Sequence, residues 1–380
     1  DRMQVARALG FPESRVRVIT PYIGGAFGGK DEAHVQIHAA LLAHAARRPV
    51  SLIRGRHESI LTHVKRHPFI VQCTTAATRD GRLLAVKARA IADAGPYSNS
   101  SHEVLNKFGE FIGGPYTVQN LEIEKIAVRT NNPMTGAFRG FGAPQAAFVY
   151  ESQMDELARK LGMDPLEIRL LNGVETGTRM YTGVVVRQGA GMKESLHKAA
   201  QMIGWRTRAE CERAPAPHLR RGWGMATILK GSGLGRGLAD HAGVRVEMYR
   251  DGTVLLQSAA ADMGQGIVAV LAQLVAERLG VEMSAVRAPR ADTAQAPDAG
   301  ASCASRQVMV SGNAALRAAD PIRHSLLKAA AQKTRIPAER LNLRGGRLYV
   351  DGAPHELSVG DLAERALSRG YPLHAEGRYE

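Results

Sequence analysis

Residues 136–145 read Gly-Ala-Phe-Arg-Gly-Phe-Gly-Ala-Pro-Gln, and this stretch restricts the local fold more than any other part of the chain. Glycine costs about 1 kcal/mol relative to alanine in a helix interior and leaves gaps in the surface of a strand, so neither element is expected here. Glycine does allow backbone to approach a ligand closely, while the aromatic rings add flat apolar faces and arginine adds five N–H donors. We therefore predict a cofactor loop, with a glycine-rich turn anchored by two phenylalanines as the simpler alternative.

Regular structure is predicted on both sides of this loop. Alternating polar and apolar residues indicate strands over 15–20, 50–54, 69–78 and 83–93. An Arg-Asp-Gly turn, in which glycine supplies the positive φ, predicts a hairpin at 79–81 and again at 250–252. Apolar residues with a period of about 3.6 residues predict helices. These helices span 31–46, 146–161, 267–279 and 313–333. Because strands and helices mix without strict alternation, we predict an α+β protein, and the recurring hairpin leaves an internal repeat open.

The length of 380 residues predicts more than one domain, because a single core rarely grows this large. Residues 206–222 are rich in arginine and glutamate, contain two prolines and lack apolar periodicity, which is typical of a linker. We therefore predict a first mixed α/β domain over 1–205 and a second over 223–380.

Composition excludes several classes of function. The net charge of +14 comes from scattered rather than clustered basic residues, and an aromatic content of 5% provides no stacking platform for nucleic acid. No apolar run approaches the roughly 18 residues of a membrane span, so a cytoplasmic protein is expected. Cys73, Cys211 and Cys303 lie too far apart in sequence for a Cys-x-x-Cys metal or iron–sulfur motif.

Three other loops of glycine or small residues have the same character. Gly24-Gly25-Ala26-Phe27-Gly28-Gly29-Lys30-Asp31 matches part of a phosphate-binding loop, but Asp31 stands where serine or threonine should hold magnesium, which argues against a nucleotide triphosphatase. Asp262-Met263-Gly264-Gln265-Gly266 and Gly300-Ala301-Ser302-Cys303-Ala304-Ser305-Arg306 also permit close backbone approach. Taken alone, each of these two could equally be a capping turn or a flexible loop.

Together the four loops resemble those of the molybdenum-binding subunit in the xanthine dehydrogenase and aldehyde oxidase family. The resemblance rests on Gly-Gly-Ala-Phe-Gly-Gly-Lys at 24–30, Ala-Phe-Arg-Gly-Phe-Gly at 137–142, Met-Gly-Gln-Gly at 263–266 and the small residues at 300–306, and it covers essentially the whole chain. It implies a molybdenum hydroxylase that oxidises a purine, an N-heterocycle or an aldehyde with oxygen from water. It also implies two domains with the cofactor between them.

The resemblance further implies which groups bind the cofactor and the substrate. The pterin dithiolene would hold molybdenum without a protein ligand, in the cytosine dinucleotide form that bacterial relatives suggest, and [2Fe-2S] clusters and FAD would lie on partner domains or subunits. The implied cofactor-binding residues are Gly25, Ala26, Phe27, Gly28, Ala137, Phe138, Arg139, Gly140, Met263, Gly264, Gln265, Gly266, Ala304 and Ser305. The implied substrate contacts are Asp31, Lys107 and Phe141, with Phe141 against the substrate ring.

Two of these residues depart from the pattern of the purine-oxidising relatives. Asp31 and Lys107 fall where those relatives carry a glutamate and an arginine. The charge at each position is the same, but the length of the side chain differs. Lysine also lacks the two parallel N–H donors with which arginine binds a ligand in a bidentate manner. Purine specificity therefore stays open.

The catalytic base of the family is absent from this sequence. It is a glutamate in a Gly-Glu context near the C-terminus of the subunit, and the chain ends at Glu380 in a stretch that usually precedes that motif. We therefore expect a fragment, or one piece of a split subunit, that is inactive alone. The other interpretation is a non-catalytic molybdopterin-binding or assembly protein that keeps the loops and lacks the base.

Overall fold

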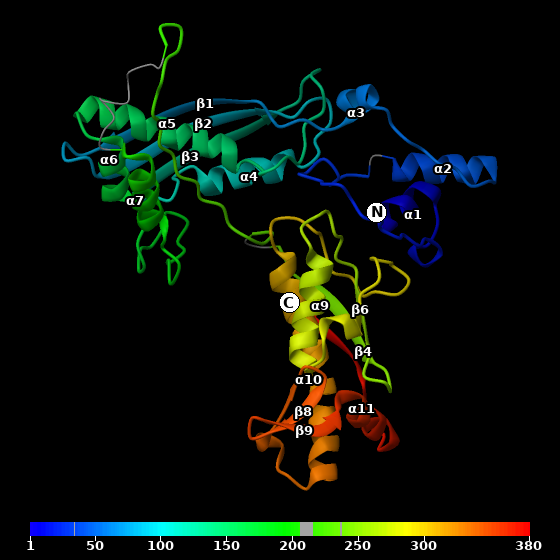
Figure 1. The fold of residues 1–380 in the computed structure, drawn as a ribbon. Coiled ribbons are helices and arrows are strands. Elements are labelled where there is room, and N and C mark those ends of the chain that lie inside the picture. Colours follow the sequence, from blue (N-terminus) through cyan, green and yellow to red (C-terminus); the bar gives the residue numbers. More distant parts are fainter. Residues whose placement is uncertain (34, 206–215, 236–237) are drawn as a thin grey trace. The chain divides into compact units, whose positions relative to one another are not determined.

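The computed structural model describes residues 1–33, 35–205, 216–235 and 238–380. Two compact units make up the chain (Figure 1). We call residues 27–31 and 54–230 the central unit, and residues 1–26, 32–53 and 231–380 the terminal unit. Most of the predicted linker, including Cys211, falls on residues 206–215, outside the described residues.

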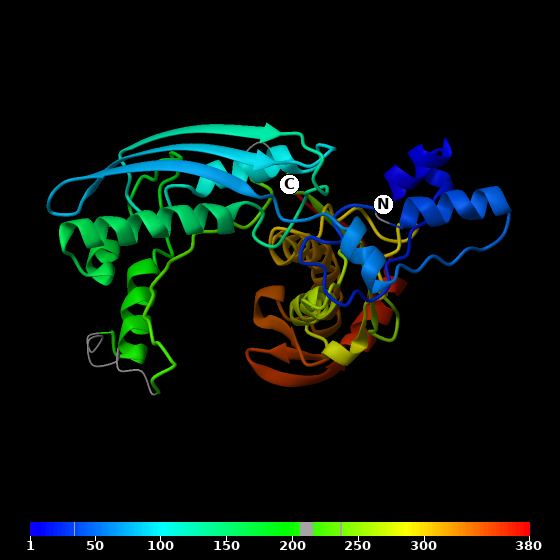
Figure 2. The same cartoon turned by 90° about the horizontal axis from the view of Figure 1, so that it is seen from above.

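A three-stranded sheet with the order β1-β2-β3 forms the base of the central unit. β1 (Phe69–Ala77) and β2 (Leu83–Asp93) form the antiparallel hairpin predicted around 79–81, and β3 (Asn120–Val128) pairs with β2 in parallel. α4 (Ser101–Phe111) and α5 (Ala143–Leu161) cover one face of the sheet (Figure 2). Among the described residues of this unit, the other helices are α3 (Arg56–Thr62), α6 (Pro165–Asn172) and α7 (Met192–Ile203).

The terminal unit contains a four-stranded sheet with the order β10-β4-β5-β6. Its strands are β4 (Ala242–Met248), β5 (Val254–Ser258), β6 (Val286–Arg287) and β10 (His374–Tyr379). α9 (Ile267–Leu279) and the long α10 (Gln307–Thr334) bury an alanine-rich face against this sheet. A Cβ at Gly377 would lie 2.1 Å from the carbonyl oxygen of Ala314, so glycine is what lets β10 approach α10.

Smaller elements complete the terminal unit. β7 (Leu341–Arg344), β8 (Arg347–Val350) and β9 (Ala353–Ser358) form a separate antiparallel sheet that leads into α11 (Val359–Ser368). The N-terminal residues add α1 (Arg2–Leu9) and α2 (Gln36–Ala46). Short 3-10 turns are η1 (Glu13–Arg15), η3 (Met283–Ala285) and η4 (Ala338–Arg340).

The N-terminal residues are held in the terminal unit by contacts over a long sequence separation. Ile19 forms an antiparallel bridge with Asp292, and the backbone N–H of Thr20 donates to the Ala291 carbonyl at 2.9 Å. The Arg17 guanidinium pairs with the carboxylate of the same Asp292 and keeps the pKa of that carboxyl below its usual range. These contacts join the first residues of the chain to the loop that follows β6.

The α+β class predicted from the sequence is confirmed, as are both hairpins and the helix over 267–279. The strands predicted over 15–20 and 50–54 are wrong: the first is reduced to the single bridge at Ile19, and the second has no regular structure. α10 begins at Gln307, six residues before the predicted start at 313. Its first turns were hidden because Gln307 and Ser311, two polar residues on the buried face, bond to each other and interrupt the apolar pattern.

Candidate cofactor site

The loop at 24–31 is where the chain passes from the terminal unit to the central unit and back. In the terminal unit, the backbone N–H of Gly25 donates to the Met263 carbonyl at 3.2 Å. In the central unit, the Phe27 carbonyl accepts from the backbone N–H of Arg139 at 2.8 Å. The candidate loops are thereby gathered into two clusters, one in each unit.

The central cluster joins residues 27–31 to the loop at 137–142. A Cβ at Gly28 would lie 2.7 Å from the Ala137 carbonyl oxygen, so only glycine permits this approach of the two backbones. The Arg139 guanidinium lies 5.5 Å from the centre of the Phe27 ring, a cation–π arrangement. Phe27 and Phe141 both have positive φ, at 53° and 49°, which costs a non-glycine residue about 1–2 kcal/mol. Strained residues of this kind persist only where surrounding contacts hold them in place, and they are concentrated at binding and active sites.

Arg66 and His67 brace this loop from behind, although no motif in the sequence marks either residue. The Nη2 atom of Arg66 donates to the Arg139 carbonyl at 2.6 Å, and its guanidinium lies 4.5 Å from the centre of the Phe138 ring. The side-chain amide of Gln145 donates to the His67 carbonyl at 3.2 Å. Two consecutive residues therefore fix both ends of the segment from 139 to 145. Burial lowers the pKa of His67, so its ring favours the neutral form.

α4 lies directly behind the end of the same loop. A Cβ at Gly142 would lie 2.3 Å from the Val104 carbonyl oxygen, so the loop touches the backbone of this helix. Lys107 lies on α4, but its ammonium group pairs with Glu110 at 2.6 Å. Asp31 is exposed as a residue, yet nearby protein atoms limit hydration of its carboxyl group and raise its pKa.

In the terminal cluster, Asp262 organises the loop that precedes α9. Its carboxylate accepts from the backbone N–H groups of Gly264 at 2.9 Å and Gly266 at 3.3 Å. The Gln265 side chain folds back, donating to the Ala261 carbonyl at 2.9 Å and accepting from the Met263 N–H at 2.6 Å. The tip of this loop, at Gly264 and Gln265, is exposed, and the backbone N–H groups of Met263, Gly264 and Gly266 are used internally. It therefore offers a ligand the remaining Gln265 amide hydrogen and its carbonyls.

The second part of the terminal cluster is the small-residue loop at 300–306. The Ser302 hydroxyl accepts from the Ala261 N–H at 2.9 Å, which ties this loop to the one before α9. Ala304 and Ser305 are consecutive residues with positive φ, at 52° and 54°. The Arg306 side chain is fully buried and forms an ion pair with Asp240 at 2.5 Å.

These loops fit an electron-rich cofactor through their backbone donors. Among the described residues, the N–H groups of Phe27, Gly28 and Gly29 donate to no other group, and neither do those of Ala304 and Ser305. Successive N–H groups in left-handed turns form concavities that bind anionic or strongly polar atoms. Ala304 and Ser305 also precede the N-terminus of α10, where the helix dipole favours negative charge. The chemistry of the donor set therefore matches a phosphate-bearing or oxo-bearing group.

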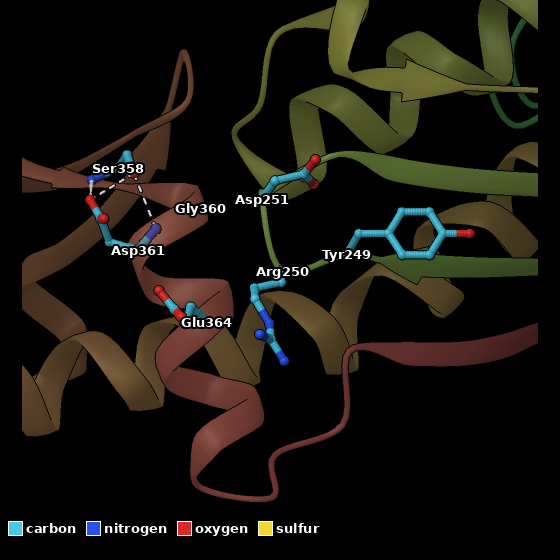
Figure 3. A pocket seen from close by; sticks show the side chains of 7 residues that line it. All are labelled: Tyr249, Arg250, Asp251, Ser358, Gly360, Asp361 and Glu364. Atoms are coloured by element: carbon cyan, nitrogen blue, oxygen red, sulfur yellow. Dashed lines mark hydrogen bonds between the residues drawn. The ribbon is translucent and has the colours of Figure 1, made fainter.

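Other features of the described residues do not add a second site of this kind. The recess in Figure 3 is lined by Tyr249, Arg250, Asp251, Ser358, Gly360, Asp361 and Glu364. The carboxylates of Asp251 and Asp361 are taken up by Thr253 and Ser358 in local turns. In the same part of the chain, no cluster of three His, Cys, Asp or Glu side chains could hold a metal ion. None of the described helices is both long and apolar enough to cross a membrane.

Comparison with known sequences agrees with this arrangement. Two molybdopterin cofactor-binding domains match residues 1–173 and 198–380. A probable xanthine dehydrogenase subunit from Bacillus subtilis (strain 168) is 36% identical over 344 residues, which is 90% of this chain and 45% of the relative. The chain belongs to the xanthine dehydrogenase and aldehyde oxidase family. The predicted resemblance is thus confirmed, and molybdopterin cofactor binding is a property of both domains.

Further relatives of this family carry different names. The nicotinate dehydrogenase large molybdopterin subunit of Eubacterium barkeri is 45% identical over 201 residues, covering 53% of this chain and 47% of the relative. The crystal structure of quinoline 2-oxidoreductase from Pseudomonas putida 86 superimposes with a TM-score of 0.87 at 27% identity, covering 100% of this chain and 51% of that one. The chain spans about half the length of the curated relatives it matches.

Proposed function

We propose that this chain forms part of a molybdenum hydroxylase that oxidises a purine, another N-heterocycle or an aldehyde with oxygen from water. The observation that carries the proposal is the set of backbone donors at 27–29 and 304–305 that have no partner among the described residues, built into domains of a molybdopterin-binding family. The names of its relatives, xanthine dehydrogenase and nicotinate dehydrogenase, support a nitrogen heterocycle as the substrate class.

The cofactor in this proposal is molybdopterin, in its cytosine dinucleotide form. When bound, it supplies the oxygen-transfer and electron-accepting chemistry, and the protein supplies binding and orientation. Residues 25–28 and 137–140 hold it through backbone and the Arg139 side chain, and Ala304 and Ser305 donate from their backbone. Residues 263–266 hold it through the exposed Gln265 amide, since the neighbouring N–H groups already bond to Asp262.

Three side chains act on the substrate in this proposal. Phe141 packs against the heterocyclic ring, with its backbone fixed by an N–H to the Phe138 carbonyl at 2.8 Å. Asp31, whose raised pKa lets it keep a proton to higher pH than an ordinary aspartate, donates to or accepts from a ring nitrogen. Lys107 acts as a single charge, because its pairing with Glu110 and its lack of a guanidinium fork exclude bidentate binding.

Two functions lie outside this chain in the proposal. In the proposal none of residues 1–380 serves as the catalytic glutamate of the family, so this chain binds cofactor but does not turn over alone. Electrons leave through [2Fe-2S] clusters and FAD on partner domains or subunits.

The test is purification of the complete native complex, followed by pterin and molybdenum analysis and dye reduction with hypoxanthine, nicotinate and benzaldehyde. We expect bound molybdopterin and turnover of at least one substrate, with Phe141→Ala raising KM. Phe148→Ala is the matched control, because Phe148 is 78% exposed on α5 and should leave KM unchanged. Pterin without turnover of any substrate in the complete complex would instead indicate a binding or assembly protein, and absence of pterin would contradict both functions.

A further inference from the structure

Arg306, the buried arginine at the end of the loop at 300–306, has a role that no sequence motif indicates. We propose that the Arg306–Asp240 pair is a positioning device, which holds Gly233-Leu234 and Ala304-Ser305 in one fixed arrangement. Arg306 acts on a ligand only through the backbone of Ala304 and Ser305. This role rests on the proposed function for what those two residues bind.

The contacts of Arg306 show that each nitrogen of its guanidinium donates to an acceptor inside the protein. The residue is 0% exposed, and its Nη1 atom donates to the Ala299 and Ala301 carbonyls at 3.2 and 2.8 Å. Nη2 donates to the His241 carbonyl at 2.6 Å, and Nε donates to Asp240 at 2.5 Å. A guanidinium with acceptors on all three nitrogens is not free to bind a substrate anion, so Arg306 is a positioning residue rather than a ligand-binding one.

Asp240 extends this arrangement to a second segment. Besides the bond from Arg306, its carboxylate accepts from the backbone N–H of Leu234, at 3.1 Å to Oδ2. The adjacent N–H of Gly233 donates to the Ala304 carbonyl at 2.9 Å. The ion pair therefore reaches Ala304 by two routes, one through residues 299–301 and the other through residues 233–234.

Two glycines leave the space that this ion pair needs. A Cβ at Gly233 would lie 2.5 Å from Asp240 Oδ2, and a Cβ at Gly300 would lie 2.9 Å from Arg306 Nη1. Both glycines also have positive φ, at 87° and 61°. A side chain at either position would push one partner of the pair aside.

The turn that the pair supports is strained, which explains why such a device is needed. Ala304 and Ser305 both lie in the left-handed region, which is unfavourable for an L-residue. Conformations of this kind persist only where surrounding contacts determine them. Without the pair, the two residues are expected to relax and their N–H groups to lose their common direction.

The first experiment measures amide hydrogen exchange in the 380-residue chain without cofactor. We expect Arg306→Lys, which keeps the charge but loses the fork, to speed exchange in 231–235 and 299–305 by about tenfold. Arg323→Lys is the matched control, since Arg323 lies on α10, the helix that follows Arg306 directly, and also donates to a backbone carbonyl, that of Arg278, at 2.9 Å. Asp240→Asn, which keeps the shape of the side chain, should give a smaller change in the same two segments and decides the matter if Arg306→Lys fails to fold. Parental exchange rates in both segments would overturn the proposal.

A second readout separates this inference from the proposed function. The same variants, in the complete native complex, are analysed for retained molybdopterin and for the steady-state constants of the substrate found. Faster exchange with molybdopterin content or KM changed at least about fivefold supports the positioning role. Faster exchange with both quantities at the parental level overturns it, because the pair would then serve the fold alone. If the parental complex itself lacks molybdopterin, the proposed function fails, and the exchange result still shows whether the pair fixes the two segments.

Discussion

Two loops of this protein stand at equivalent points in the element order and are built by different means. In the central unit an antiparallel hairpin, a helix and a parallel strand lead to the loop at 136–142 and then to α5. In the terminal unit the same order leads to the loop at 300–306 and then to α10. The first loop is shaped mainly by missing side chains, at Gly140 and Gly142. The second is shaped by the buried Arg306–Asp240 ion pair. The conformation of the loop is therefore determined by steric fit in the central unit and by an electrostatic contact in the terminal unit.

The steric solution should be the less tolerant of change. Gly142→Ala places a Cβ 2.3 Å from the Val104 carbonyl oxygen at φ 94°, and we expect a loss of about 4 kcal/mol in the free energy of unfolding. Urea denaturation followed by circular dichroism measures it. Gly162→Ala at the other end of α5 is the control: its φ is 66° and no atom lies within 4 Å of the added Cβ, so about 1 kcal/mol is expected. Equal losses for the two variants would contradict the steric explanation.

Removal of the charge from the second loop should have the next largest effect. Arg306→Met leaves Asp240 and three carbonyls without their donor, and we expect a loss of about 2–3 kcal/mol. The loss stays at the lower end for a buried pair because the Asp240 side chain is 24% exposed and can be rehydrated. Arg323→Met on α10, the helix that follows Arg306, should cost less than about 1 kcal/mol in the same urea titration. A loss at Arg306 no larger than at Arg323 would show that the pair contributes little to the fold.

The loop before α9 offers a third case, in which φ alone requires glycine. A Cβ at Gly264 would meet no atom within 4 Å, although φ is 98°. Gly264→Ala should therefore cost about 1 kcal/mol in urea denaturation. A loss as large as that of Gly142→Ala would mean that this loop is packed more tightly than its exposed position indicates.

The smallest expected effect is on the pH dependence of the free energy of unfolding. It concerns His67, which supports the loop at 137–142. Burial lowers the folded-state pKa of His67 below about 6.5, its ordinary value, so the folded protein binds fewer protons than the unfolded chain just below that pH. The stability due to neutral His67 is complete above pH 6.5 and decreases as pH falls toward the folded-state pKa. His67→Gln should flatten this part of the stability curve, measured by urea titrations at successive pH values. His102→Gln, at an exposed position of α4, is the control and should leave the slope as it is.

Much of the local structure could be predicted because its causes are local. The Asp-Gly turns at 80–81 and 251–252 determine both hairpins, and the apolar period of 267–279 determines α9. The glycine loops could be recognised because few structures tolerate so many glycines. That these loops gather into two clusters could not be read from any single one of them.

What could not be predicted depends on contacts between distant residues. Arg306 looks like any arginine in the sequence, and only the fold places Asp240 and three carbonyls around it. Arg66 and His67 gave no sign of bracing the loop at 137–142 for the same reason. The strand predicted over 15–20 failed because its partner is a loop around Asp292 rather than a neighbouring strand. The domain limits predicted at 205 and 223 stay a prediction.

The route of the chain between the two units has a consequence for biosynthesis. Residues 1–26 and 32–53 belong to the unit completed by 231–380, and the bonds of Arg17 and Val18 to residues 292–293 span 275 positions. At about 5–20 residues per second, the ribosome delivers those partners about 14–55 s after Arg17 and Val18 emerge. The central unit, nearly continuous in sequence, can fold during this interval, while the N-terminal residues wait unpaired. Chaperones and proteases therefore meet that segment before its partners do, and the yield of this protein depends on how long it stays protected.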